Sequence, residues 1–139
     1  NVNHSMSIGL FYKDELVCIC TFGKPRFNKK YKLELLRFCN KHGYNVIGGL
    51  SKILSHLKNT PIISYSHRRL FNGNGYLKSG FKLSHRTEPG YFWYSSKFGV
   101  MSRYKTQKHK LNTELTENEY MRNQGFLKIY DCGQNVYTK

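Results

Sequence analysis

The stretch from Tyr31 to Phe81 constrains the fold of this chain more than any other part of the sequence. Lys32–Cys39 alternates between two sets of side chains with the period of two that is typical of a β-strand. A helix with one apolar stripe is predicted next, at positions i, i+3, i+4 and i+7, by Leu50, Ile53, Leu54 and Leu57. Ile62–Tyr65 then predicts a short strand. A strand, a helix and a strand in this order predict a right-handed crossover with two roughly parallel strands.

Two glycines, Gly48 and Gly49, stand at the mouth of the predicted helix. Glycine lets backbone N–H groups approach an anion closely, and a helix dipole favours negative charge at this end. The diglycine is therefore open to two interpretations. It makes only a tight strand-to-helix turn, or it belongs to a turn that binds the phosphates of a cofactor, formed by Ile47, Gly48, Gly49, Leu50, Ser51 and Lys52.

The remaining elements are predicted around this crossover, and 139 residues suit a single domain, 1–139. A charged turn, Lys13-Asp14-Glu15, predicts a hairpin near the start of the chain. Thr116 with Glu119 forms a capping box that predicts a short helix, which Gly125 ends. Further strands are predicted at Ile8–Tyr12, Leu16–Phe22, Lys82–Arg86, Tyr91–Tyr94, Phe126–Tyr130 and Asn135–Thr138, the last two as a C-terminal hairpin. The expected fold class is α/β (α+β), with a mixed, mainly antiparallel sheet.

Positive charge is the strongest compositional feature. Twenty-three Lys and Arg face eight Asp and Glu, for a net charge of +15. Between Leu16 and Thr87 there is one acid, Glu34, against fourteen Lys and Arg. Such a chain repels itself unless polyanions accompany it, which favours nucleic acid as the partner, double-stranded DNA first, over a membrane surface. A generic basic surface that binds anions loosely is the alternative. The candidate contact residues are Lys24, Arg26, Lys29, Lys30, Arg68, Arg69, Arg103, Lys105 and Lys108.

The four cysteines, Cys18, Cys20, Cys39 and Cys132, have no CxxC spacing. We expect them to be reduced and mostly buried, as in a cytoplasmic protein, and we expect no metal site, because no Cys or His pair has the usual ligand spacing. No apolar run is long enough to span a bilayer.

Two residues are candidates for chemistry by their type and their place in the sequence. Glu34 is the only acid in the basic half and lies on a central predicted strand, so it is a candidate general base; a structural ion pair is its alternative. His67 is a second candidate base, because histidine is the residue type best suited to proton transfer at physiological pH, or else it lines a polar surface beside Arg68 and Arg69. The other acids are scattered, so no two-metal nuclease cluster is predicted.

The element order, with its end motif Tyr76-Leu77-Lys78-Ser79-Gly80-Phe81, resembles the GNAT acyltransferase fold. The resemblance implies that Tyr76 lies near a thioester and acts as the acid, with core packing as its alternative. It also implies that Ile47–Lys52 binds the pyrophosphate of acetyl-CoA or a related acyl-CoA. The basic first residue of the family's glycine turn is absent here. The family's first strand and helix would precede Asn1.

Longer phrases, among them VIGGLSKIL, ISYSHRR, GYLKSGF and IYDCGQ, resemble a Mom-like domain of phage proteins that often follows a nuclease domain in homing-endonuclease-like proteins. This resemblance implies a phage-encoded protein acting on DNA in the bacterial cytoplasm. Three hypotheses stay open. The chain transfers an acyl-type group to a nucleobase amine in DNA, or it is a non-catalytic DNA-recognition domain of a mobile-element endonuclease, or it is an RNA-directed (tRNA) acetyltransferase. The oligomeric state is not predicted.

Overall fold

The computed structural model describes residues 3–139, and the chain forms two compact units. Unit 1 comprises Asn1–Thr87 with Gln134–Lys139, and unit 2 is the intervening segment Glu88–Gly133. The expectation of one domain over 1–139 did not include such an insertion. The predicted fold class is confirmed, because the described residues form nine strands, mostly antiparallel, in two sheets together with four α-helices.

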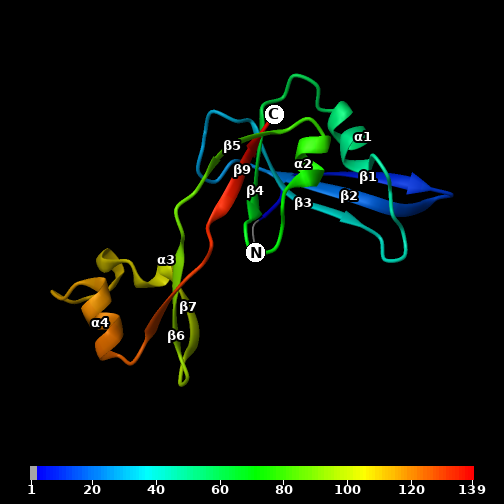
Figure 1. Cartoon of the computed structure of the whole chain (residues 1–139). Helices are drawn as coiled ribbons and strands as arrows, with labels where there is room; N and C mark the ends of the chain where they lie inside the picture. The colour runs from blue at the N-terminus through cyan, green and yellow to red at the C-terminus, as the bar shows by residue number, and fades with distance from the viewer. Residues whose placement is uncertain (1–2) are drawn as a thin grey trace. The chain divides into compact units, whose positions relative to one another are not determined.

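Unit 1 contains a six-stranded sheet in the order β1-β2-β3-β4-β9-β5. Only β3 and β4 run parallel, and every other neighbouring pair in this sheet is antiparallel. Figure 1 shows β9, in red, between β4 and β5. The strands are β1 (Met6–Tyr12), β2 (Glu15–Gly23), β3 (Leu33–Asn40), β4 (Ile62–His67), β5 (Lys82–Arg86) and β9 (Gln134–Thr138).

The predicted crossover is present. Helix α1 (Gly49–Ser55) connects β3 to the parallel strand β4, and three residues of its apolar stripe are buried: Leu50, Ile53 and Leu54. They pack in one core with side chains of β2, β3 and β9, including Cys20, Phe22, Leu35 and Tyr137. A second short helix, α2 (Asn74–Lys78), follows β4. The helix prediction is confirmed, because the apolar stripe of α1 packs against the hydrophobic core of unit 1.

The prediction of a C-terminal hairpin is wrong. Strand β8 (Leu127–Tyr130) pairs with β6 in unit 2, whereas β9 pairs with β4 and β5 in unit 1. Val136 and Tyr137 are consecutive residues of β9 and both are buried. Consecutive strand residues point to opposite faces, so β9 needs cover on both faces and a neighbour on each side, which a two-stranded hairpin does not provide.

Unit 2 is built on a three-stranded antiparallel sheet in the order β7-β6-β8, with β6 (Tyr91–Ser95) in the centre and β7 (Gly99–Ser102) at one edge. Its core is Trp93, packed with Met121 of α4 (Glu117–Asn123) and with Phe126. The predicted capping box between Thr116 and Glu119 begins α4, and Gly125 follows its end with a positive φ of 77°. The basic segment that begins at Arg103, which holds three of the candidate contact residues, forms a short helix, α3 (Arg103–Thr106), and then a 3₁₀ turn, Lys108–Lys110.

The four cysteines are free thiols, two buried (Cys18, Cys20) and two exposed (Cys39, Cys132), so the expectation that most are buried holds for the β2 pair alone. Burial raises the pKa of Cys20 to about 12. Among residues 3–139, no helix has the length and apolar composition needed to cross a bilayer.

Candidate functional site

Strands β3 and β4 pair for only part of their length. Their parallel register covers three residue pairs and ends where Leu35 faces Ser64. Beyond this point β3 stays with β2, up to Asn40, and β4 stays with β9, up to His67. The two strands therefore part. A cleft of about 600 Å³ lies here, on the face of the sheet that carries α1.

The cleft is lined by residues of three segments: the end of β3, the start of α1, and the connection from β4 into α2. Four residues of the predicted phosphate turn contribute to it, namely Gly48, Gly49, Leu50 and Ser51. The other two do not line it, and the side chain of Ile47 is 92% exposed. Gly48 has a positive φ of 70° at the helix start, so a glycine is required there by the backbone alone.

Tyr76 lines the cleft from α2. Its ring stacks on Tyr137 at a centroid distance of 4.9 Å and meets Phe81 edge-on at 5.4 Å. Tyr76 Oη and Ser64 Oγ are hydrogen-bonded at 3.0 Å. Burial raises the pKa of Tyr76, which favours the protonated phenol over the phenolate. Tyr76 therefore packs against the core, the alternative given for this residue, and it also lines the cleft; its role as an acid stays a prediction.

Ser66 was not predicted as a site residue. It lies on the same side of β4 as Ser64, lines the cleft, and is only 5% exposed. Its hydroxyl is one of three buried side-chain polar atoms in residues 3–139 that have no hydrogen-bond partner. A buried polar group without a partner costs free energy. A ligand that formed a hydrogen bond with Ser66 Oγ would recover that free energy.

Glu34 lies away from the cleft. Its neighbour Leu35 packs in the core beneath α1, and adjacent strand residues point to opposite faces of a sheet. The Glu34 carboxylate is 1% exposed and accepts hydrogen bonds from Arg26, from the backbone N at 2.9 Å and from Nε at 2.8 Å. A general base must reach its proton, and this carboxylate does not line the cleft. The ion pair, the alternative left open by the sequence, is the arrangement that the structure contains.

His67 also points away from Ser66 and does not line the cleft. Its Nδ1 accepts a hydrogen bond from the backbone N of Arg69 at 3.3 Å, within the turn that follows β4. The three predicted catalytic residues are thus not brought together: Tyr76 lies at the cleft, and Glu34 and His67 lie on the other face of the sheet.

All nine predicted nucleic-acid contacts have exposed side chains. They fall into three groups: four in the β2–β3 connection (Lys24, Arg26, Lys29, Lys30), two after β4 (Arg68, Arg69) and three in unit 2 (Arg103, Lys105, Lys108). Three members are engaged locally. Arg26 pairs with Glu34, Lys29 Nζ donates a hydrogen bond to the Pro25 carbonyl at 2.6 Å, and the guanidinium of Arg103 lies 4.9 Å from the centroid of the Tyr91 ring.

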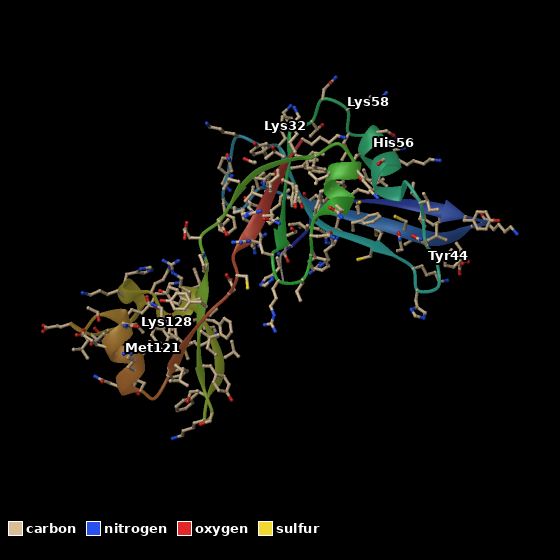
Figure 2. All side chains as sticks on the ribbon, in the orientation of Figure 1. Lys32, Tyr44, His56, Lys58, Met121 and Lys128 are labelled. Carbon is tan, nitrogen blue, oxygen red and sulfur yellow. The ribbon has the colours of Figure 1, made fainter. Side chains whose placement is uncertain are left out.

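The charge is divided unevenly between the units. Unit 2 holds seven Lys and Arg and five Asp and Glu, which leaves sixteen cations and three carboxylates, a net charge of +13, for unit 1. Among the described residues, two ion pairs occur, Arg26 with Glu34 and Lys41 with Glu15, both in unit 1. Tyr44, in the connection after β3 (Figure 2), also donates a hydrogen bond to Glu15. Fourteen of the sixteen cations in unit 1 therefore have no carboxylate within 4 Å.

Unit 2 contains its own polar centre, which the sequence did not reveal. The Glu117 carboxylate accepts hydrogen bonds from Trp93 Nε1 at 2.9 Å, Thr106 Oγ1 at 2.8 Å and Tyr91 Oη at 2.9 Å. Burial alone would raise the pKa of Glu117, yet these hydrogen bonds hold it below its ordinary value. Lys128 (Figure 2) lies 3.9 Å from the centroid of the Tyr91 ring, and its charge lowers the pKa of Glu117 further. The arrangement fixes the α4 start against β6.

Sequence reasoning missed the connection between β4 and α2 and the start of that helix, where Phe71, Asn72 and Gly73 of the connection and Gly75 of α2 line the cleft. One signal was available, the repeated Asn-Gly of Asn72–Gly75, since such pairs mark tight turns. Gly73 has a φ of 76°, and a Cβ there would meet Tyr137 Oη at 1.7 Å.

No protein-family model matches the chain, and no curated protein sequence is similar enough to stand as a relative.

Proposed function

We propose that the chain is a nucleic-acid-binding protein that engages double-stranded DNA through unit 1. The observation that carries this proposal is the set of fourteen cations in unit 1 with no carboxylate within 4 Å, over a net charge of +13. Cations that lack carboxylate partners repel one another, and a phosphate backbone relieves that repulsion while releasing its own counterions. The resemblance to DNA-directed phage domains agrees with this partner.

The proposal makes a prediction about salt. Affinity for a DNA duplex should fall steeply between low and physiological salt, because each lysine that contacts a phosphate contributes about −0.9 to the slope of log K against log salt. Replacing Lys24, Lys29 and Lys30 together with glutamine should lower the magnitude of that slope by about 3. Fluorescence anisotropy of a labelled duplex across a salt series measures both quantities.

The matched control removes three cations from the other unit, through Lys97→Gln, Lys110→Gln and Arg122→Gln. It changes the net charge equally and should leave the slope unchanged. A flat salt response of the native chain would remove the proposal. Equal losses in the two triple variants would assign the binding to net charge rather than to the β2–β3 connection. Tighter binding of the corresponding RNA duplex would replace DNA with RNA as the partner.

A second candidate function is favoured by one observation, the cleft at the parting of β3 and β4. We propose that, if the chain is catalytic, this cleft holds an acyl-CoA donor for group transfer to a nucleobase amine. Tyr76 would supply a proton to the leaving thiolate and would regain one from the attacking amine, and the unpaired hydroxyl of Ser66 would hydrogen-bond to the donor. Glu34 and His67 have no part in this version, since neither lines the cleft.

Calorimetry with acetyl-CoA tests the second candidate. Binding heat is expected at high micromolar coenzyme. Gly75 lines the cleft and has open space where a Cβ would be, so Gly75→Phe should fill the cleft without strain and abolish the heat. Gly75→Ala is the control and should retain it. Absence of heat with the native chain, or equal heat from Gly75→Phe, would exclude the cleft as an acyl-CoA site.

A further inference from the structure

One aromatic ring stands out in the basic connection between β2 and β3. The side chain of Phe27 is 74% exposed, and it lies between Arg26 and Asn28. A single exposed apolar residue is ordinary on a protein surface and by itself indicates nothing. Three features of its surroundings distinguish Phe27: the rigidity of the backbone beside it, the orientation of its ring, and the charges around it.

The backbone on both sides of Phe27 is anchored. On one side, Arg26 is held to the buried Glu34 carboxylate by its backbone N and by its side chain. On the other side, Asn28 accepts hydrogen bonds from the backbone N of Lys30 at 3.1 Å, through Oδ1, and of Tyr31 at 3.4 Å, through its carbonyl. The ring is therefore presented by a segment that has already lost its conformational freedom, which lowers the entropic cost of binding.

The ring is oriented by contacts with two neighbouring side chains, Tyr65 and Arg26, and the Arg26 guanidinium lies over the ring. Phe27 meets Tyr65 of β4 at a centroid distance of 5.8 Å and an interplanar angle of 84°. The Arg26 guanidinium carbon lies 5.4 Å from the centroid of Phe27 and 5.7 Å from that of Tyr65. These contacts fix the ring, and yet three quarters of its side chain stay accessible.

The surrounding charges select the ligand. The exposed cations of this connection other than Arg26 are all lysines without a carboxylate within 4 Å: Lys24, Lys29, Lys30 and Lys32. Arg26 is different, because Glu34 already neutralises its charge. A rigid aromatic ring among uncompensated lysines matches a nucleotide, whose base stacks on the ring while its phosphates meet the ammonium groups. A neutral or basic apolar partner would match the ring but would leave the lysine ammonium groups without anionic partners.

We propose that Phe27 stacks on an unpaired nucleobase and that Glu34, through Arg26, positions it to do so. The inference rests on the proposed nucleic-acid binding and refines it: the β2–β3 connection recognises a single-stranded or locally opened segment rather than an intact duplex alone. Stacking needs a free π-face of the base, which a paired base within a helix does not offer.

The test uses the full chain and a single-stranded oligonucleotide that carries one 2-aminopurine, whose fluorescence is quenched by stacking. Phe27→Leu keeps an apolar side chain and removes the π-face, so affinity should fall by about 5- to 100-fold and quenching should be lost. Phe27→Trp should retain both. The matched control is Phe11→Leu, since Phe11 is 68% exposed in the same unit and stands beside the acidic turn of the β1–β2 hairpin.

The outcomes separate this inference from the proposed function. If the native chain shows salt-dependent binding and Phe27→Leu binds and quenches like the native chain, stacking is refuted and nucleic-acid binding stands. Equal losses in Phe27→Leu and Phe11→Leu also refute it, because they indicate general apolar contact. If the native chain binds no nucleic acid, the proposed function fails first. Since Phe27 is exposed, a circular dichroism spectrum unchanged by the substitution is expected and verifies the fold.

Discussion

Replacing Arg26 with alanine is expected to destabilise unit 1 by about 3 kcal/mol, the low end of the range for removing one partner of a buried ion pair. The substitution leaves the Glu34 carboxylate, 1% exposed, without its cation and with only the backbone N of residue 26 as a donor. The low end applies because 39% of the Arg26 side chain is exposed, so water reaches part of the pair. Urea unfolding followed by far-ultraviolet circular dichroism measures the loss.

Two further variants identify the cause of that loss. Adding Glu34→Gln to Arg26→Ala removes the uncompensated charge, so the double variant should be more stable than Arg26→Ala alone. Lys41→Ala breaks the other ion pair of unit 1, in which both side chains are exposed, and should have no measurable effect. An Arg26→Ala chain that unfolds at the native midpoint would show that Glu34 is solvated well enough to dispense with its partner.

The second large effect is expected in unit 2. Glu117→Ala should destabilise this unit by about 3 kcal/mol, because the fully buried Trp93 Nε1 loses its acceptor and the fully buried Thr106 Oγ1 keeps only the Arg103 carbonyl. Trp93 is the only tryptophan of the chain, so its fluorescence reports unit 2 specifically. The expected result is a red-shifted emission at a lower urea concentration than in the native chain.

Acid should reproduce this effect in the native chain. The pKa of Glu117 is lowered in the folded state, so its stabilising contribution is present above the pKa of the unfolded chain and is lost as pH falls through the folded pKa. Glu117→Gln should remove this part of the acid sensitivity, and Glu114→Gln, at an exposed carboxylate of the same unit, should not. A Trp93 transition with the same pH dependence in the native chain and in Glu117→Gln would contradict the assigned role.

Local patterns predicted those elements whose determinants are close in sequence. The apolar stripe of α1 and the capping box of Thr116 each specify a structure within a few residues, and the structure confirms both. The strand predicted at Lys32–Cys39 is also present as β3, but a register shift against β2 at Leu36 interrupts the predicted alternation. The phosphate turn was predicted in the same way, and four of its six residues reach the cleft. The cleft itself was not predictable, because it arises where β3 and β4 stop pairing, and pairing length is not a local property.

Charge composition pointed to a polyanion, but it did not distinguish one cation from another. Arg26 and Lys24 are both basic residues of the same connection, and only the fold shows that the first is committed to Glu34. Glu34 was conspicuous as the one acid between Leu16 and Thr87, which suggested a catalytic base. The structure gives this single acid a different role, because its buried carboxylate anchors the one arginine beside it.

The sequence by itself determined the α+β class, the crossover from β3 through α1 to β4, and a strong excess of positive charge. These follow from periodicity, turn residues and composition, which can be read directly from the sequence. The tertiary structure alone decided that the last strand enters the sheet between β4 and β5, that Glu117 gathers three donors, and that Glu34 and Tyr76 face opposite sides of one sheet. Each of these depends on residues far apart in sequence. Their contacts depend on the packing of the whole unit, which no local sequence pattern specifies.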